Sequence, residues 1–480
     1  MIKRKRKYKR RRKMTYYLAI DIGASSGRHI LSWYEDGHIR MKEIYRFENK
    51  IIRKNGRLCW NVEYLFGEII NGMKKCSEEG TIPVSVGIDT WGVDYALLDK
   101  DDKLIGDVYA YRDSRTIGAD ESVYKIITKE NLYARTGIQK QIFNTIYQLV
   151  ADKEKEPGRL SAAKTLLMVP DYFHFLLTGI KAGEYTNAST TQLLSPKTCE
   201  WDYELIYALG LPVDIFPKIK KPGSRLGKLL PKIKEAVGYD CDVVIPCTHD
   251  TASAVAAVPA DCDRPLYISS GTWSLMGTEL KRADCSEESR LHNFTNEGGY
   301  DRRYRYLKNI MGLWMIQSVR REYNCEYSFA QLCDMAIEND DFLSVVDVND
   351  NRFLAPDSMT EAIKEYCAET KQQIPENAGQ LAAVIYNSLA RCYSITVKEI
   401  ESITGEQFDS IYVVGGGSNA DYLNQLTTKY THKTVYAGPG EATAIGNIIV
   451  QMMHGGVFDS LMAARECVGR SFDIKKYEAE

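Results

Sequence analysis

A strand, a short turn rich in glycine and hydroxyl residues, and a second strand follow one another near the start of the chain. The apolar run 17–20 ends at Asp21, the turn 23–28 reads Gly-Ala-Ser-Ser-Gly-Arg, and a second apolar run covers 29–33. Flexible backbone N–H groups, two hydroxyls and an arginine can face an anion in such a turn. The hairpin suits the terminal phosphates of a nucleotide, with Asp21 facing a hydrated magnesium ion. Taken alone, an ordinary hairpin turn is the alternative.

The same pattern returns in the second half of the chain. Residues 266–277 predict a strand, a turn at Gly271 and Thr272, and another strand. Three glycines at 415–417 follow the apolar run 411–414. Glycines at the end of a strand let the backbone approach a flat ligand closely, although a flexible turn is the simpler interpretation. Two phosphate-type hairpins in two halves predict a duplicated architecture with a ligand in the cleft between them.

The length of the chain predicts two domains. At 480 residues it is too long for one ordinary hydrophobic core. A polar stretch between Pro259 and Pro265 is the preferred boundary, which gives one domain over 15–258 and a second over 259–480. The hydrophobic fraction of 44% and the charged fraction of 26% are typical of soluble globular proteins.

The net charge of −2 conceals an uneven distribution. Residues 1–13 contain ten Lys and Arg and no acidic residue, and the rest of the chain has 52 basic against 64 acidic residues, a net charge of −12. An acidic body binds nucleic acid poorly, so we expect no nucleic-acid partner. Residues 1–14 are predicted to form a basic disordered extension. An extended translation start explains it most simply, and a polyanion-binding arm is the alternative.

Two further features concern the environment of the chain. It contains no run of 18 or more apolar residues, which predicts no membrane span. Its 12 cysteines are scattered, and no pair has Cys-x-x-Cys spacing. This favours reduced thiols in the cytoplasm over a disulfide framework or a zinc site.

One aspartate is a candidate catalytic base. His249, Asp250 and Thr251 follow a buried-strand pattern at 243–246 and precede a helix of small residues at 251–257. A side chain at such a junction projects into a cleft, where it could accept a proton from an alcohol during phosphoryl transfer. A helix N-cap is the alternative role for Asp250.

Taken together, these residues resemble the FGGY family of carbohydrate kinases, within the actin and hexokinase-like ATPase superfamily. The resemblance covers nearly all of residues 15–470. The segments that carry it are Asp21–Arg28, Gly87–Asp94, Tyr111–Thr116, Glu184–Thr191, His249–Ser253, Gly271–Ser274, Asn296–Tyr300 and Gly415–Asn419.

The resemblance implies a fold and an activity. The implied fold is α/β, with two actin-like (ribonuclease H-like) domains and a catalytic cleft between them. The implied activity is ATP-dependent phosphorylation of L-rhamnulose at its 1-hydroxyl, with Mg²⁺, and the partners are therefore a ketose sugar and ATP. The alternatives are a kinase of another deoxy-ketose such as L-fuculose and a non-catalytic sensor of sugar or nucleotide. A sensor has no use for a base. The oligomeric state, monomer or dimer, stays open.

The resemblance also implies roles for individual residues. Asp250 is the implied catalytic base, and Asp21 is the implied metal-binding residue, through a water molecule. The implied ATP-binding residues are Ala24, Ser25, Ser26, Gly27, Arg28, Thr272, Gln317 and Gly415. The implied sugar-binding residues are Gly92, His249, Asp250, Thr251 and Asn309.

Several side chains are left with two interpretations. Asn309 and Gln317 lie eight residues apart, and on one helix both would face the same cleft. Asp94 is either a sugar ligand or a turn former. Arg112 and Arg115 either anchor sugar oxygens or make structural ion pairs.

Overall fold

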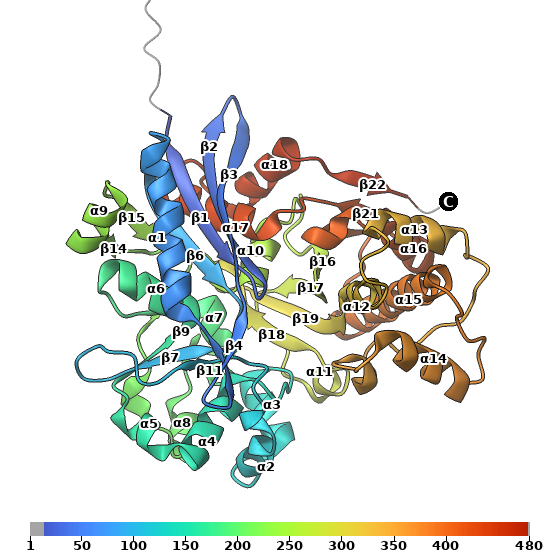
Figure 1. Cartoon of the computed structure of the whole chain (residues 1–480), viewed down its shortest axis with the longest axis horizontal. Helices are drawn as coiled ribbons and strands as arrows, with labels where there is room; N and C mark the ends of the chain where they lie inside the picture. The colour runs from blue at the N-terminus through green and yellow to red at the C-terminus, as the bar shows by residue number, and fades with distance from the viewer. Residues whose placement is uncertain (1–13, 479–480) are drawn as a thin grey trace, which may run out of the picture.

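The computed structural model describes residues 14–478 and contains two large sheets with helices packed around them (Figure 1). The predicted basic extension therefore lies, apart from Met14, outside the described residues. The first sheet has the strand order β14-β15-β6-β1-β2-β3. These strands are β1 (Tyr16–Ile22), β2 (Ser26–Glu35), β3 (His38–Glu48), β6 (Pro83–Thr90), β14 (Arg225–Lys228) and β15 (Asp242–Val244).

The second sheet repeats the arrangement of the first. Its order is β18-β19-β17-β16-β20-β21-β22. Its strands are β16 (Leu266–Ser270), β17 (Trp273–Leu280), β18 (Thr295–Gly298), β19 (Tyr304–Met311), β20 (Ser410–Val414), β21 (Thr434–Ala437) and β22 (Lys475–Tyr477). In each sheet three neighbouring strands pair antiparallel: β1, β2 and β3 in the first, and β16, β17 and β19 in the second. Two further strands pair in parallel on the other side of the first of these: β6 and β15 beside β1, and β20 and β21 beside β16. The predicted duplication is confirmed.

Helices cover the sheets, and shorter strands form small sheets beside the first one. In the first half the helices are α1 (Val62–Glu78), α2 (Ala119–Tyr124), α3 (Lys129–Thr136), α4 (Thr145–Lys155), α5 (Pro157–Ala162), α6 (Val169–Thr178), α7 (Tyr185–Ser189), α8 (Tyr203–Ala208), α9 (Pro231–Val237) and α10 (Asp250–Ala256). The small strands are β4 (Ile51–Lys54), β5 (Arg57–Trp60), β7 (Tyr95–Leu98), β8 (Val108–Tyr109), β9 (Thr165–Met168), β10 (Gly183–Glu184), β11 (Leu194–Ser195), β12 (Glu200–Trp201) and β13 (Ile219–Lys220).

The second half is built around one long helix. Its helices are α11 (Glu287–Leu291), α12 (Trp314–Glu322), α13 (Phe329–Ile337), α14 (Met359–Glu369), α15 (Ala378–Thr404), α16 (Asp421–Thr431), α17 (Ala442–His454) and α18 (Leu461–Ser471). The Asn377 side chain caps the start of α15, and Gly405 ends it in the left-handed conformation. Leu381, Ile385 and Leu389 recur every four residues on α15 and are buried in the core of this half. Among the described helices, none combines the length and the apolar character needed to cross a membrane.

Two helices join the halves. α10 of the first half packs against α17 of the second, and a Cβ atom at Gly446 would overlap the backbone of Ser253. From α17, Asn447 donates through its side-chain amide to the carbonyl of Gly87 on β6 (3.1 Å), and Gln451 donates to the carbonyl of Leu18 on β1 (2.9 Å). Helix α17 of the second half is therefore bonded directly to the first sheet.

The predicted helix that would carry both Asn309 and Gln317 is wrong. Asn309 and Gln317 do not share a helix, because Asn309 lies on β19 and Gln317 lies on α12. Residue 309 pairs with Leu275 of β17, so the sheet extends to Met311. The chain turns at Gly312, where a Cβ atom would meet the backbone between Trp273 and Ser274. The domain boundary at residues 258 and 259 stays a prediction.

The contact at Gly446 gives a test of how the halves are joined. We expect Gly446→Ala to lower the free energy of unfolding by about 1–3 kcal/mol, because the added methyl group forces α10 and α17 apart. Denaturant unfolding measures this change. Gly67→Ala is the matched control, since Gly67 lies on α1 with open space around its Cβ position. The control should stabilise α1 by about 0.5–1 kcal/mol. Equal stability of Gly446→Ala and the wild-type protein would contradict the tight contact.

Candidate active site

A cleft of about 500 Å³ lies between the two sheets and is lined by residues from both halves. This volume falls within the usual range of small-molecule sites. Of the residues predicted to bind ligands, those lining the cleft are Ala24, Ser25, Arg28, Gly92, His249, Asp250, Thr251, Thr272, Asn309 and Gly415. Segments far apart in the sequence therefore meet at one place.

Four predicted residues do not line the cleft. Asp21 is buried behind it at the end of β1. Ser26 and Gly27 are the first two residues of β2, and a side chain at Gly27 would overlap the ring of Phe47. Gln317 is half-buried on α12. Gly27 is therefore needed for packing against Phe47, a constraint that does not involve a ligand.

The turn between β1 and β2 is closed and charged. The backbone N–H of Gly23 donates to the carbonyl of Ser26 (2.9 Å). The Arg28 guanidinium donates to the Asp21 carboxylate through Nε (3.0 Å) and Nη2 (2.9 Å) and also pairs with Glu441, which precedes α17. Arg28 thus links this turn to the second half of the molecule.

The corresponding turn between β16 and β17 is held by the start of α12. The N–H groups of Leu313 and Trp314 donate to the carbonyls of Gly271 and Thr272 (both 3.1 Å). The turn is therefore fixed through its backbone, while Thr272 is exposed in the cleft. Its hydroxyl is free to meet a phosphate oxygen.

Asp250 is the first residue of α10 and lines the same cleft as both turns. The N-cap position belongs to His249, whose side chain makes no capping bond, so the N-cap alternative for Asp250 is wrong. Asp250 Oδ1 accepts from the backbone N–H of Thr251 (2.6 Å). Burial raises the pKa of the Asp250 carboxyl, and the charge of Asp21 adds to this shift while His249 opposes it. A less acidic carboxylate is a better proton acceptor.

A second buried aspartate lies beside Asp21. Asp89 on β6 is the register partner of Asp21 on β1, so both carboxylates stand at the same end of neighbouring parallel strands. One oxygen of Asp89 accepts from the side-chain amide of Asn447 (2.6 Å), and the other has no hydrogen-bond partner. Burial raises the pKa of Asp89 well above its usual range, and the neighbouring Asp21 raises it further.

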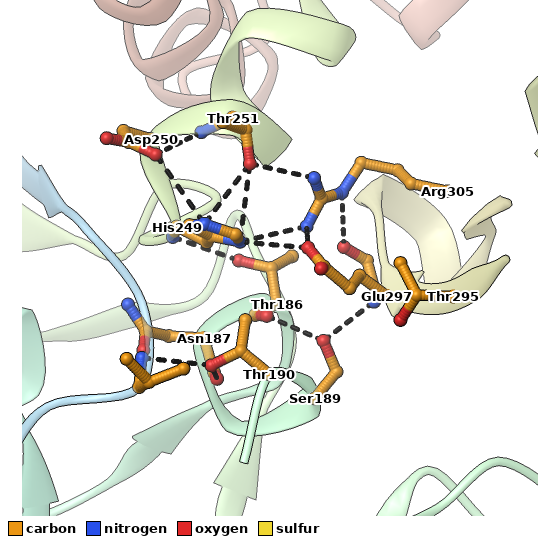
Figure 2. Close-up of polar contacts among 12 residues, drawn as sticks. Thr186, Asn187, Ser189, Thr190, His249, Asp250, Thr251, Thr295, Glu297 and Arg305 are labelled. Atoms are coloured by element: carbon orange, nitrogen blue, oxygen red, sulfur yellow. Dashed lines mark hydrogen bonds and ion pairs between the residues drawn. The ribbon is translucent and has the colours of Figure 1, made fainter. Parts of the chain in front are cut away.

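The loop before β7 forms one wall of the cleft. The hydroxyl of Thr190 accepts from the backbone N–H of Val93 (3.1 Å) (Figure 2). The Asn187 amide donates to the carbonyl of Trp91 (3.3 Å). A Cβ atom at Gly92 would crowd Thr190 and His249. Glycine at this position therefore lets the backbone of the cleft wall pack closely against Thr190 and His249.

The structure gives Asp94 a role other than sugar ligand or turn former. Its carboxylate is buried outside the cleft and accepts from the indole N–H groups of Trp60 (2.7 Å) and Trp91 (3.0 Å) and from the backbone N–H of Tyr111 (3.0 Å). The two indoles pack with their centroids 4.0 Å apart. Burial raises the pKa of Asp94 to about 6. Asp94 thus positions the aromatic wall.

The two arginines differ in their surroundings. Arg115 is buried and donates to Asp152 (3.1 Å) and Gln148 (2.6 Å), so it makes a structural ion pair. Arg112 lines the cleft, with its guanidinium 5.9 Å from the ring centroid of Trp314. Of Arg112 and Arg115, only Arg112 can therefore contact a ligand in the cleft.

Among the residues in or behind the cleft that were not predicted as site residues, three polar ones make contacts across it. Gln139 lines the cleft and accepts from the Asn309 amide (3.0 Å), which joins the two halves. Glu297 also lines the cleft, and Arg305 lies behind it, bonded to His249 and Thr251. The Asn296–Tyr300 block in the sequence pointed to Glu297, whereas Arg305 and Gln139 gave no local signal.

Comparisons with known proteins agree with this geometry. Residues 16–257 match the N-terminal domain, and residues 266–455 the C-terminal domain, of the FGGY family of carbohydrate kinases. A curated rhamnulokinase of Halalkalibacterium halodurans is 53% identical over 464 residues, which cover 97% of this chain and 99% of that protein. A rhamnulokinase of Bacillus subtilis is 41% identical, over 96% of this chain and 95% of that protein.

Solved structures match the fold at low sequence identity. Gluconate kinase from Lactobacillus acidophilus superimposes with a TM-score of 0.79 at 16% identity, covering 98% of this chain and 94% of that one. Plasmodium falciparum glycerol kinase with ADP gives a TM-score of 0.76 at 14% identity, covering 97% and 94%. The predicted two-domain α/β fold is confirmed. The duplicated sheets, the shared cleft and the full-length matches place this chain in the FGGY family of carbohydrate kinases.

Proposed function

We propose that this protein transfers the γ-phosphoryl group of ATP to the 1-hydroxyl of L-rhamnulose, giving L-rhamnulose 1-phosphate and ADP. The observation that carries the proposal is the place of Asp250, which lies in one cleft with both phosphate-type turns. The rhamnulokinase relatives, similar over nearly the whole chain, support the choice of sugar. L-Fuculose is the alternative acceptor.

Each half is assigned mainly one substrate and contributes some contacts to the other. Residues 15–258 supply the sugar site and the first phosphate turn, and residues 259–480 supply most of the nucleotide site. The proposed ATP contacts are Ala24, Ser25, Ser26, Gly27, Arg28, Thr272, Gln317 and Gly415. The proposed sugar contacts are Gly92, His249, Asp250, Thr251 and Asn309. Ser26, Gly27 and Gln317 lie outside the cleft lining, so their contacts with ATP require the backbone or a change in conformation.

The residues present fit a magnesium ion that is held mainly by phosphate. The described residues contain no group of three metal-binding side chains, whereas magnesium at nucleotide sites commonly needs only one or two carboxylates in addition to phosphates and water. Asp21 and the adjacent Asp89, with its unpartnered oxygen, provide them. When bound, the ion would neutralise charge on the phosphates.

The chemical step itself needs a base and alignment. Asp250, once ionised, accepts the proton of the sugar 1-hydroxyl while the hydroxyl oxygen attacks the γ-phosphorus of ATP and ADP leaves. The backbone at Gly92 and the side chains of His249 and Asn309 hold the sugar. Thr272 and the β1–β2 turn hold the phosphates, and positioning supplies most of the rate enhancement.

Removing the base tests its role. We expect Asp250→Asn to lower kcat by at least ~10²-fold, because the amide keeps the shape but cannot accept a proton. ATP affinity, measured by calorimetry, should change little. Asp334→Asn is the matched control, since Asp334 is exposed on α13 and does not line the cleft. Turnover of Asp250→Asn within a few-fold of the wild-type rate would remove Asp250 from this role.

The pH dependence follows from the raised pKa of Asp250. Only the ionised carboxylate accepts a proton, so kcat/KM for the sugar falls as the pH decreases through this pKa. We expect the acid limb of the pH profile to lie above the usual aspartate value of about 3.9. The profile is measured at saturating ATP and magnesium over the range in which the protein stays folded. An acid limb at or below that value would contradict the assignment.

The choice of sugar is tested with a panel of ketoses. A coupled assay of ADP release should give the highest kcat/KM for L-rhamnulose, with L-fuculose as the comparison substrate. Phosphorus NMR of the product should show a phosphate ester at the 1-position. A higher kcat/KM for L-fuculose would favour the alternative, and no ADP release with any ketose would contradict the proposed activity.

A further inference from the structure

A buried arginine of the second half contacts the histidine next to the candidate base in the first half. Arg305 lies on β19, and its side chain is completely buried. Its Nη2 lies 2.9 Å from Nδ1 of His249, and its Nη1 donates to the hydroxyl of Thr251 (2.9 Å) (Figure 2). Nε donates to the carbonyl of Gly298 (2.9 Å), which fixes the guanidinium plane.

This contact determines where the imidazole carries its proton. A guanidinium has only N–H donors and keeps its charge, so it cannot accept a hydrogen bond. A hydrogen bond from Arg305 to Nδ1 of His249 therefore requires the lone pair on Nδ1. In the neutral ring the proton then resides on Nε2.

The surroundings of Nε2 fit a donor. Thr251 Oγ1 lies 3.2 Å away and Asp250 Oδ1 lies 3.6 Å away, and both atoms can accept. A Cβ atom at Gly92 would lie 3.3 Å from Nε2, so this edge of the ring faces the backbone of the cleft wall. An Nε2–H group at this place can donate to a hydroxyl oxygen of a sugar that lies against Gly92.

Glu297 holds the arginine in place. Its carboxylate accepts from Nη2 of Arg305 (2.8 Å) and lies 3.4 Å from Nδ1 of His249, farther than the guanidinium. Burial opposes ionisation of Glu297, but the charges and hydrogen bonds of Arg305 and His249 together outweigh it and lower the pKa of Glu297 to about 2. The pair is therefore ionised, and the charge of the buried arginine is balanced.

We propose that Arg305, anchored by Glu297, is a positioning residue that holds His249 in the Nε2–H tautomer, so that the histidine donates a hydrogen bond to the acceptor sugar beside Asp250. The identity of that sugar rests on the proposed function. The tautomer itself does not, because the contacts that set it exist within the protein. Removal of Arg305 would leave the Glu297 carboxylate and the Thr251 hydroxyl, each 3.4 Å from Nδ1, and the negative charge of Glu297 favours a proton on that nitrogen.

Nitrogen NMR tests the tautomer directly. Long-range ¹H–¹⁵N correlation spectra of the full chain with ¹⁵N-labelled histidine, recorded at pH 8, distinguish protonated from unprotonated ring nitrogens. The His249→Gln variant assigns the signals of His249 among those of the seven histidines. We expect a protonated Nε2 and an unprotonated Nδ1 in the wild-type protein. A proton on Nδ1, in the neutral or the doubly protonated ring, would overturn the proposal without any variant of Arg305.

Variants of Arg305 test the cause. Arg305→Met should move the proton of His249 towards Nδ1, and Arg305→Lys, which keeps one charged donor, should largely restore the wild-type pattern. Arg303→Met is the matched control, because Arg303 is bonded to Asp263 outside the cleft lining. An unchanged tautomer in Arg305→Met would overturn the proposal. If Arg305→Met does not fold, the wild-type spectrum and that of Arg305→Lys still decide.

Kinetics test the consequence for the sugar. Loss of one well-placed hydrogen bond should raise the sugar KM of Arg305→Met by about tenfold, with the KM for ATP unchanged and partial recovery in Arg305→Lys. A structural defect alone would raise both KM values together, and that result would overturn the positioning role. If the wild-type enzyme phosphorylates no ketose, the proposed function fails while the NMR result on the tautomer still stands.

Discussion

The direct backbone contact between α10 and α17 positions the rest of the site. Gly446 allows α17 to reach the Ser253 backbone, and Asn447, one residue further, bonds to Gly87 and Asp89 of the first sheet. Asp250 begins the same helix α10 that makes this contact. The helix that joins the halves is therefore also the one that carries the candidate base, so a shift between the halves moves Asp250 relative to the phosphate turn between β16 and β17. Small residues at this contact are what permit the two sheets to face one cleft.

The electrostatics of the cleft suit an anionic ligand that arrives with a cation. Burial raises the pKa values of Asp89 and Asp250, and the charge of the nearby Asp21 raises both further. The Arg28 guanidinium neutralises the charge of the Asp21 carboxylate, and it also forms an ion pair with Glu441 of the second half. Accumulated acidic charge in a buried site costs stability in the free protein, and it is typical of sites that have a catalytic task. A nucleotide with its magnesium ion would relieve part of this repulsion.

Local patterns predicted the fold and much of the cleft, whereas contacts between distant segments did not show in the sequence. The strand–turn–strand hairpins and the junction at Asp250 were found because their signals are contiguous. Asn309 was expected on a helix, because its eight-residue separation from Gln317 fits two helical turns; pairing of β19 with β17 overrides that spacing. Arg305 was missed for a related reason. In the sequence it is a polar residue between two tyrosines, and its contact is with His249, which lies 56 residues away.

The central claim is that both halves form one site in which sugar and nucleotide are held together. Calorimetric titration of L-rhamnulose in the presence and absence of a non-hydrolysable ATP analogue with magnesium tests it most directly. Because each ligand orders part of the other's surroundings, the account predicts tighter sugar binding when the analogue is present, and by linkage an equal effect of the sugar on the analogue. Equal sugar affinity in both titrations would contradict it.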